Sequence, residues 1–354
     1  MARRSILVFG ASYGSLLGMK LALAGHSVKL VCRAPTAALI NAEGVVVRMP
    51  VKGRDAPVEI RTRELAGCVT ATTPDAADPA DHDLAVLAMQ EPQYRLPGVR
   101  ELFDATARSR VPCLSIMNMP PLPYLARIPG IDTARCIESY TDSTLWDAFD
   151  PGLMTLCSPD PQAFRPPDSP GNVLEVRLPT NFKAAAFEGA EHTALLRELS
   201  GGIEAARLDA GGEAIDLPVK LKVHDSVFVP LAKWAMLLSG NYRCVLDGGV
   251  RSIRDAVHGE IGTARSVYEW VAELCVSMGA AAADLVPFEK YALAAQSLRA
   301  PSSAARALAA GAPNIERVDR LVQAMGRQRG MEHPHVDEIV ARVDAWLVRN
   351  RLKG

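Results

Sequence analysis

The chain has 354 residues, 49% of them apolar, and a formal net charge of −1. This length predicts two domains with sizeable cores, whereas the near-zero charge argues against a nucleic-acid or membrane-surface role, which needs a strong positive field. No apolar run reaches the roughly 18 residues that cross a bilayer. The seven cysteines lack C-x-x-C spacing, so we expect reduced thiols in a cytoplasmic protein.

The first part of the chain alternates short apolar strands with helical segments. We expect a helix at Ser15–Ala24, ended by Gly25, a hairpin of Gly44–Met49 and Val58–Thr62, and strands at Ser5–Phe9, Ser27–Cys32, Leu84–Ala88 and Val111–Ile116. The continuous apolar run at Leu84–Ala88 is typical of a parallel strand buried on both faces. Such alternation predicts a right-handed parallel sheet covered by helices.

Further along, the pattern predicts late strands and then helices alone. The expected strands are Arg135–Ser139, Leu153–Cys157 and Val173–Leu178, the proline-rich SPDPQAFRPPDSPG is expected to be a surface loop, and the expected helices are Glu191–Ala206, Val227–Ser239, Ser252–Met278, Val286–Leu298, Ile315–Arg329 and Pro334–Arg349. The sequence therefore predicts an α/β chain of two domains. A Rossmann-type parallel-sheet domain would span residues 1–216, and an all-helical domain would span residues 217–354.

The stretch ILVFGASYGSLLG resembles a phosphate turn, but it departs from the G-x-G-x-x-G pattern. Counting from Gly10, the second and third glycine positions hold Ser12 and Ser15, and the next glycine is Gly14. A strand, a glycine turn and a helix start expose backbone N–H groups and the positive end of the helix dipole to an anion. Gly10, Ser12, Tyr13 and Gly14 are therefore candidate cofactor residues. The alternative is a turn that merely connects two elements.

Arg33 follows the second expected strand, 23 residues after Gly10. An acidic residue there would bind the ribose hydroxyls of NAD, whereas an arginine favours the extra phosphate of NADP. Arg33 therefore predicts NADP as the cofactor.

Lys233 and Asn241 are eight residues apart in FVPLAKWAMLLSGNYR. On an α-helix this spacing is a little over two turns, so both side chains would lie on nearly one face. Lys233 is either a surface lysine of an amphipathic helix or a desolvated general acid.

Two histidine motifs invite functional interpretations. His224-Asp225 could act in acid–base chemistry, and His333-Pro-His335 could bind a metal. Adjacent residues do not share a face, and proline and acidic residues are ordinary at a helix start. We expect structural roles for both motifs and no metal site.

Several stretches, in order along nearly the whole chain, resemble the ketopantoate reductase family of two-domain dehydrogenases. They are FGASYGSLLGMKLALAGHSVKLVCR, SIMNMP with Asn118, AKWAMLLSGN with Lys233 and Asn241, SIRDAVHGEIGTARSVYEWVAELCVSMG, and PSSAARALAAGAPNIERVDRLVQAMGRQRGMEHP with Ser302. The resemblance implies a Rossmann domain followed by a helical domain, like that of 6-phosphogluconate dehydrogenase.

The resemblance also implies NADPH-dependent reduction of a 2-oxo acid. Lys233 would donate a proton to the carbonyl oxygen, with Asn118 and Asn241 as the other catalytic residues. Ser302 and Asn314 would contact the substrate, and Gln90 would lie near the cofactor.

The chain departs from the family at four places. The glycine loop is one residue short, Gln90 replaces a common lysine, Leu237 replaces an asparagine, and Asn314 replaces a substrate-binding glutamate. The nearby Glu316 is expected on a different helical face. A pocket with Leu237 and Asn314 should be less polar than one built for ketopantoate, so we expect another substrate.

Two alternatives to a 2-oxo acid reductase stay open. One is a different redox reaction on the same scaffold, such as oxidation of a 2-hydroxy acid or an opine-type reductive amination. The other is a non-redox enzyme or binding protein with a repurposed cofactor site. The expected partner is a small-molecule substrate, with no nucleic acid or membrane partner, and the chain is a candidate homodimer.

Overall fold

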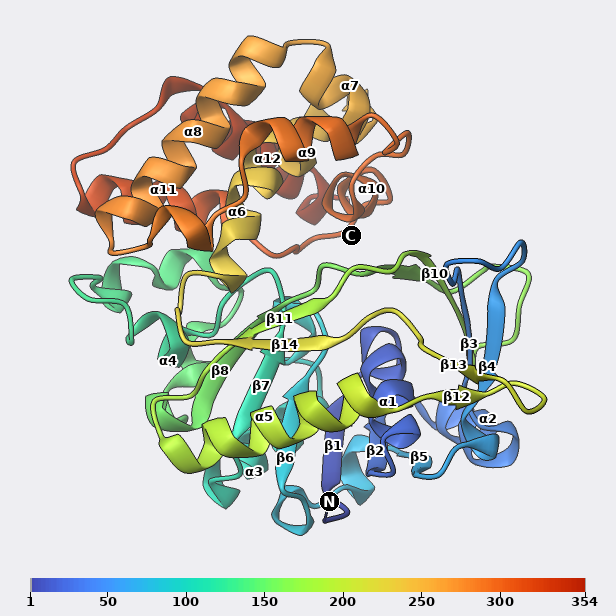
Figure 1. Ribbon diagram of the computed structural model, residues 1–354. Coiled ribbons are helices and arrows are strands. Elements are labelled where there is room, and N and C mark those ends of the chain that lie inside the picture. The colour runs from blue at the N-terminus through green and yellow to red at the C-terminus, as the bar shows by residue number, and fades with distance from the viewer. Residues whose placement is uncertain (1, 354) are drawn as a thin grey trace. The chain divides into compact units, whose positions relative to one another are not determined.

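The computed structural model describes residues 2–353, which form two compact units (Figure 1). The first unit contains the chain up to Met89, Gln93–Tyr124 and Leu145–Asp225. The second contains Gln90–Pro92, Leu125–Thr144 and the chain from Ser226 onward. The division at residues 216 and 217 stays a prediction, since the compact units are discontinuous in sequence.

The first unit is built on an eight-stranded, mostly parallel sheet with the order β14-β11-β8-β7-β6-β1-β2-β5. Its strands are β1 (Ser5–Phe9), β2 (Ser27–Val31), β5 (Cys68–Thr72), β6 (Leu84–Leu87), β7 (Cys113–Ile116), β8 (Met154–Ser158), β11 (Phe182–Ala185) and β14 (Leu221–His224). All neighbours pair in parallel except β8 and β11. The six strands from β5 to β8 have the order of a doubly wound dinucleotide-binding sheet.

Helices α1 (Tyr13–Leu23), α2 (Ala34–Glu43), α3 (Val99–Ser109) and α5 (Ala190–Ala205) belong to this unit, and the short α4 (Leu122–Leu125) is divided between the two units after Tyr124. Helices α1 and α5 lie side by side along the sheet (Figure 1). The core includes Ile6, Val8, Leu30, Val86 and Leu114, all from the central parallel strands. Their near-complete burial explains why these strands are continuous apolar runs in the sequence.

A second sheet has the order β4-β3-β10-β9, formed by β3 (Val46–Met49), β4 (Val58–Arg61), β9 (Gln162–Phe164) and β10 (Val173–Leu178). The antiparallel β3–β4 pair confirms the expected hairpin. The prediction that the whole proline-rich segment is a surface loop is wrong, because β9 lies within it and pairs with β10. Strands β12 (Leu208–Asp209) and β13 (Ala214–Ile215) form a separate small hairpin.

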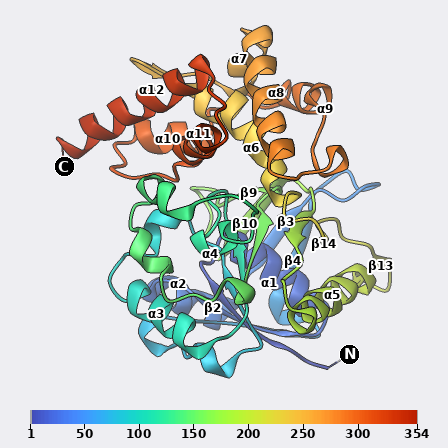
Figure 2. The ribbon, with the colours of Figure 1, turned by 90° about the vertical axis from the view of Figure 1, so that its left-hand side faces the viewer.

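The second unit is mainly helical. Its helices are α6 (Lys233–Met236), α7 (Ile253–His258), α8 (Ile261–Ser277), α9 (Phe288–Ala295), α10 (Ser303–Ala309), α11 (Val318–Gln328) and α12 (Pro334–Arg351), and β15 (Val245–Leu246) and β16 (Gly249–Val250) form a short hairpin. Helices α11 and α12 pack together (Figure 2). The hairpin makes this unit slightly less than all-helical.

Three sequence-based expectations are corrected in the second unit. Arg135–Ser139 is no strand: it lies in two 3₁₀ turns, the first begun by the Asp132 carboxylate, which accepts from the Ala134 N–H. The helix expected over Ser252–Met278 divides into α7 and α8, because the chain turns at Gly259 and the Glu260 carboxylate binds Arg243 and Arg251.

The helix expected at Val227–Ser239 is also irregular. A 3₁₀ turn at Pro230–Ala232 precedes α6, and a π-helical turn at Leu237–Asn241 follows it. Among residues 2–353, no helix combines the length and apolarity needed to span a membrane. The seven cysteines form no disulfide.

Candidate functional site

The turn after β1 is shaped by Gly10. This glycine has φ +93°, and a Cβ there would lie 2.8 Å from Met89 Cγ and 3.0 Å from the Ala88 carbonyl oxygen. Its N–H donates to the Val31 carbonyl oxygen at the end of β2, at 2.9 Å. Glycine is therefore required where the ends of β1, β2 and β6 converge.

Gly14 explains how a loop that departs from the fingerprint still forms. It lies in the first turn of α1, where a Cβ would come within 2.6 Å of Val8 Cγ1. Close packing between helix and strand is the role of the third glycine in the usual pattern. Gly14 supplies this packing one residue earlier than the fingerprint predicts.

The start of α1 presents unpaired donors. Within residues 2–353, the backbone N–H groups of Ala11 and Ser12 donate to no protein acceptor, and the Ser12 side chain forms no capping bond. The first turn of α1 holds no acidic residue. Unpaired N–H groups and the positive end of a helix dipole together favour an anion. The Tyr13 side chain points elsewhere, because its hydroxyl donates to the Pro161 carbonyl oxygen at 2.8 Å.

The other expected residues of the cofactor side follow strand ends. Arg33 is exposed just after β2 and precedes α2. Asn118 is half-buried two residues after β7. Gln90 is exposed three residues after β6 and belongs to the second unit. In an open parallel sheet, ligands bind at the carboxyl ends of the strands, which is where β2 and β7 position Arg33 and Asn118.

In the second unit, Lys233 begins α6 and Asn241 ends the π-helical turn, and both side chains are half-buried. Eight residues of regular α-helix at about 100° each would leave them about 80° apart. A π turn is wider and rotates less per residue, so it reduces this offset. Short π segments inside α-helices often occur at functional sites.

The π turn is fixed from outside by Tyr291 of α9. Its hydroxyl donates to the Met236 carbonyl oxygen at 3.2 Å and occupies the space beside Gly240, where a Cβ would lie 1.9 Å from it. The Ser239 hydroxyl donates to the Ala235 carbonyl oxygen at 2.6 Å. Leu237, which also lies in this turn, is buried.

Ser302 is held next to Asn241. The Ser302 hydroxyl donates to the Asn241 carbonyl oxygen at 2.7 Å and accepts from the Ala305 N–H at 3.1 Å, where it caps α10. Ser302 as a whole residue is 2% exposed. Lys233, Asn241 and Ser302 are therefore linked through one short stretch of backbone.

Asn314 lies apart from this set, because its side-chain oxygen accepts from Arg351 of α12 at 3.1 Å. Glu316 is not on a helix, since α11 begins only at Val318, so the expectation based on a helical face is wrong. Glu316 is buried, and its carbonyl oxygen accepts from the Tyr242 hydroxyl, one residue after Asn241.

Glu91 is a buried carboxyl group that sequence analysis missed. It is fully buried and accepts from the Thr141 N–H at 3.0 Å and the Thr141 hydroxyl at 2.9 Å. Its own N–H donates to Glu316 Oε1 at 3.5 Å. Burial, with a smaller contribution from Glu316, raises the pKa of Glu91 to about 7. The only sequence signal for Glu91 is that an acidic residue follows Gln90, four residues after the end of an apolar strand.

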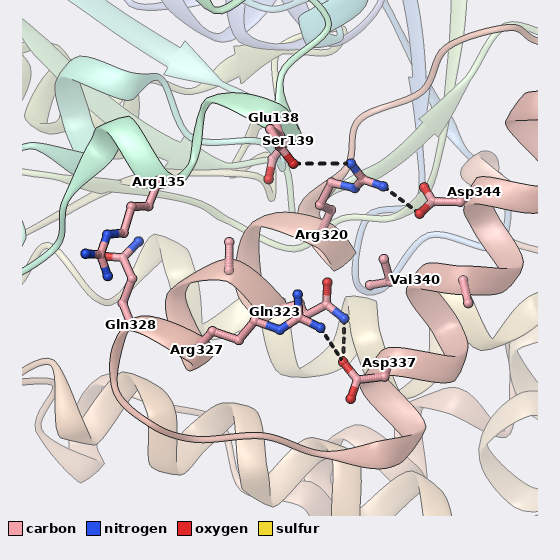
Figure 3. A pocket seen from close by; sticks show the side chains of 12 residues that line it. Arg135, Glu138, Ser139, Arg320, Gln323, Arg327, Gln328, Asp337, Val340 and Asp344 are labelled. Carbon is pink, nitrogen blue, oxygen red and sulfur yellow. Dashed lines mark hydrogen bonds and ion pairs between the residues drawn. The ribbon is translucent and has the colours of Figure 1, made fainter.

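A separate cavity of about 570 Å³ lies between α11, α12 and the 3₁₀ turns near Arg135 (Figure 3). Its charged side chains are paired: Arg320 with Asp344 at 2.5 Å, and Arg327 with Asp337 at 3.3 Å. None of the expected site residues lines it. Among residues 2–353, no group of three or more His, Cys, Asp or Glu side chains is arranged to bind a metal ion.

Comparisons with known proteins find similarity only at the level of structure. No family model matches the chain, and no curated protein is similar in sequence. A protein of Ralstonia solanacearum named as a ketopantoate reductase superposes with a TM-score of 0.69 at 15% identity, with 98% of each chain covered. A D-mandelate dehydrogenase with NADH and anilino(oxo)acetate gives 0.64 at 13% identity, covering 98% of this chain and 99% of that one.

A dimeric ketopantoate reductase from Staphylococcus aureus gives a TM-score of 0.59 at 9% identity, covering 98% of this chain and 99% of that one. The similarity extends over both compact units in each case. The chain therefore has the fold of the ketopantoate reductases and of D-mandelate dehydrogenase: a mostly parallel, doubly wound sheet followed by a helical unit.

Proposed function

We propose that the protein is an NADPH-dependent reductase of a 2-oxo acid or a related carbonyl compound, with a natural substrate other than ketopantoate. The observation that carries the proposal is the turn after β1. There Gly10 is sterically required and the N–H groups of Ala11 and Ser12 are unpaired at the start of α1. A turn that merely connected two elements would need neither feature.

The residues of the turn fit a dinucleotide. The N–H groups around Ser12, Tyr13 and Gly14 would bind the pyrophosphate, and Arg33 would bind the 2′-phosphate. Gln90 would lie near the nicotinamide ribose. When bound, the nicotinamide supplies the hydride that reduces the carbonyl carbon.

The side chains of the second unit would supply the proton and the orientation. Lys233 would donate a hydrogen bond to the carbonyl oxygen, stabilise its developing negative charge and transfer the proton. Asn118 and Asn241 would orient the 2-oxo group. Ser302 would contact the substrate and hold the Asn241 backbone through the bond that the structure shows. Asn314 stays a candidate for the substrate carboxylate.

The substrate class follows from Leu237. This buried leucine cannot donate a hydrogen bond to a substrate hydroxyl, so we propose a 2-oxo acid with an apolar or aromatic group on the carbonyl carbon. The fold shared with a D-mandelate dehydrogenase is consistent with such a substrate. It also keeps oxidation of the corresponding 2-hydroxy acid as the second candidate reaction.

Titration of the purified protein with NADPH, followed by nicotinamide fluorescence, tests the proposal. We expect saturable binding, turnover with aromatic 2-oxo acids, and loss of turnover without loss of NADPH affinity in Lys233→Ala. Absence of binding to both NADPH and NADH at millimolar concentration would eliminate both candidate reactions, the reduction of a 2-oxo acid and the oxidation of a 2-hydroxy acid. Turnover of ketopantoate above about 1 per second would contradict the substrate proposal.

The oligomeric state is a separate proposal. One relative of the fold is a dimeric enzyme, and we propose a homodimer here. Sedimentation velocity at micromolar concentration should show a species of about twice 38.0 kDa, and a single 38.0 kDa species would contradict it.

A further inference from the structure

Arg165 extends from the second sheet to the phosphate turn. It follows β9 directly, and its half-buried side chain donates from Nη2 to the Ala11 carbonyl oxygen at 2.6 Å. Ala11 is one of the two residues whose N–H groups are unpaired. The guanidinium group therefore lies at the edge of the candidate phosphate site, although 154 residues separate the two positions in sequence.

The charges around Arg165 are unbalanced. In the described chain, the ionisable groups that act on it are Cys32 and Arg33, and neither is a carboxylate. The Arg33 backbone carbonyl accepts from the Ala37 N–H, but the Arg33 guanidinium group has no hydrogen-bond or ion-pair partner within residues 2–353. Burial, and the nearby Arg33 charge, lower the pKa of Arg165. Two guanidinium groups near the end of β2 without a counter-ion form a site that a multiply charged anion would stabilise.

The position of this pair decides which anion fits. Cys32 and Arg33 follow β2, and the end of the second strand of a Rossmann sheet lies beside the adenosine ribose of a bound dinucleotide. We propose that Arg165 is a second cationic contact for the 2′-phosphate of NADPH, so that Arg33 and Arg165 hold this dianion together. The inference rests on the proposed function and adds a specificity-determining residue from another sheet.

The hairpin that carries Arg165 is a firm support. β9 pairs with β10, and β10 pairs in parallel with β3. The Arg177 guanidinium of β10 lies 4.1 Å from the Phe164 ring centre, directly before Arg165. A charged group held next to regular structure, as Arg165 is next to β9, is positioned more precisely toward a ligand than a group on a mobile loop. Arg177 also offers a matched control, because it is an arginine of the same hairpin that faces an aromatic ring.

The alternative is that Arg165 only supports the loop through its bond to Ala11. In that case its loss would weaken all dinucleotides equally. A role at the 2′-phosphate would weaken only ligands that carry this phosphate. The test therefore compares NADPH with NADH, and adds adenosine 2′-monophosphate as a probe that contains the phosphate but no nicotinamide.

Dissociation constants are measured on the full chain for wild type, Arg165→Ala, Arg165→Lys and Arg177→Ala. We expect Arg165→Ala to weaken NADPH and adenosine 2′-monophosphate about ten- to hundredfold, as loss of a charge-assisted hydrogen bond does, and NADH less than about threefold. The NADPH affinity of Arg165→Lys should lie between those of wild type and Arg165→Ala, because lysine keeps the charge but not the paired N–H donors of the guanidinium group. Arg177→Ala, which removes the contact with the Phe164 ring, should leave the ratio of the NADPH and NADH constants unchanged.

Each contrary outcome identifies what fails. Equal weakening of NADPH and NADH by Arg165→Ala would reduce Arg165 to loop support or to a contact with the pyrophosphate that both dinucleotides carry, and unchanged NADPH affinity would give it no role; either overturns the inference. Wild type that binds NADH but shows no preference for NADPH overturns the two-arginine site and leaves nicotinamide chemistry intact. Wild type that binds neither dinucleotide overturns the proposed function itself.

Discussion

Glu91 is a carboxyl group whose burial should make stability depend on pH. Its pKa of about 7 exceeds the ordinary value of 4.5 because it is buried beside Glu316. The folded chain therefore keeps this proton to a higher pH than the unfolded chain does. The stabilisation is fully present below pH 4.5, declines as pH rises, and is lost as pH passes through 7.

We expect wild type to lose up to about 3 kcal/mol of stability relative to Glu91→Gln between pH 4.5 and pH 8. Urea unfolding at both pH values measures the difference. Glu101→Gln on the exposed face of α3 is the control, and it should follow wild type. A Glu91→Gln variant with the same pH dependence as wild type would show that the pKa of Glu91 is the same in the folded and unfolded chains, and would contradict a raised pKa.

Lys20 has the opposite pH dependence. This lysine of α1 is 1% exposed and donates to the carbonyl oxygens of Leu217 and Pro218 at 3.1 and 3.0 Å. Burial, followed by the charge of Lys220, lowers the pKa of Lys20 to about 7 from 10.5. The stability it contributes is present above pH 10.5 and is lost as pH falls through 7.

As pH rises from 7 to 9, the free energy of unfolding of wild type should therefore increase by about 2–3 kcal/mol more than that of Lys20→Met. Urea unfolding of both proteins at these two pH values measures the difference. The methionine also removes two hydrogen bonds, but their loss is the same at both pH values and so does not affect how stability changes with pH. Lys29→Met on β2 is the control, with no relative change expected. Parallel pH profiles for wild type and Lys20→Met would contradict a depressed pKa.

Among the elements, the π turn at Leu237–Asn241 is the one on which the candidate chemistry most depends. A Cβ at Gly240 would lie 1.9 Å from the Tyr291 hydroxyl and 3.3 Å from Val257 Cγ2. We expect Gly240→Ala to displace the turn, lower kcat at least about tenfold by misplacing Lys233 and Asn241, and leave NADPH affinity unchanged. Steady-state kinetics and fluorescence titration measure the two effects.

Removal of the Tyr291 hydroxyl tests the same contact from the other side. The double variant Gly240→Ala/Tyr291→Phe should recover part of the lost kcat, because the closest clash is with that oxygen. Gly262→Ala on α8, where a Cβ meets nothing within 4 Å, is the matched control and should keep full activity. Full activity in Gly240→Ala would mean that the turn does not position the catalytic groups.

The sequence predicts the helices and strands whose own residues show a clear hydrophobic pattern. It misses those that form only through pairing with a distant part of the chain. The apolar runs at Ser5–Phe9 and Leu84–Ala88 are recognisable alone because both faces are buried. Strand β9 is not recognisable alone, because it is a short strand within a proline-rich segment and forms by pairing with β10. The same limit applies to the site: Arg33 follows a predictable strand, whereas Arg165 and Glu91 depend on contacts with distant residues.

At the scale of the whole molecule, two compact units carry different parts of the proposed activity. The candidate cofactor residues Gly10, Ser12, Arg33 and Arg165 belong to the first unit, and Lys233 belongs to the second. Chains with more than one compact unit often do not unfold in a single two-state step. Stability and cofactor binding should therefore be separable by changes that act within one unit.

The buried ion network of α11 provides this test. Asp319 is fully buried and accepts two bonds from Arg317, at 3.0 and 2.9 Å, and Arg317 also donates to Asp344 of α12 at 2.6 Å. Asp319→Asn leaves the buried guanidinium group incompletely compensated, which typically costs about 3–5 kcal/mol. Asp337→Asn, which loosens an exposed pair with Arg327, should cost less than about 1 kcal/mol.

Hydrogen exchange followed by mass spectrometry localises the effect. In Asp319→Asn, we expect amide protection to fall in α11 and α12 and to stay unchanged in β1 and β6, because each unit buries apolar side chains of its own. NADPH at a hundred times its dissociation constant should raise the free energy of any local unfolding that releases NADPH by about 2.7 kcal/mol. The largest effect is expected at the start of α1. Equal loss of protection in β1 and α11 would show instead that both units open in one cooperative step, and NADPH would then protect both.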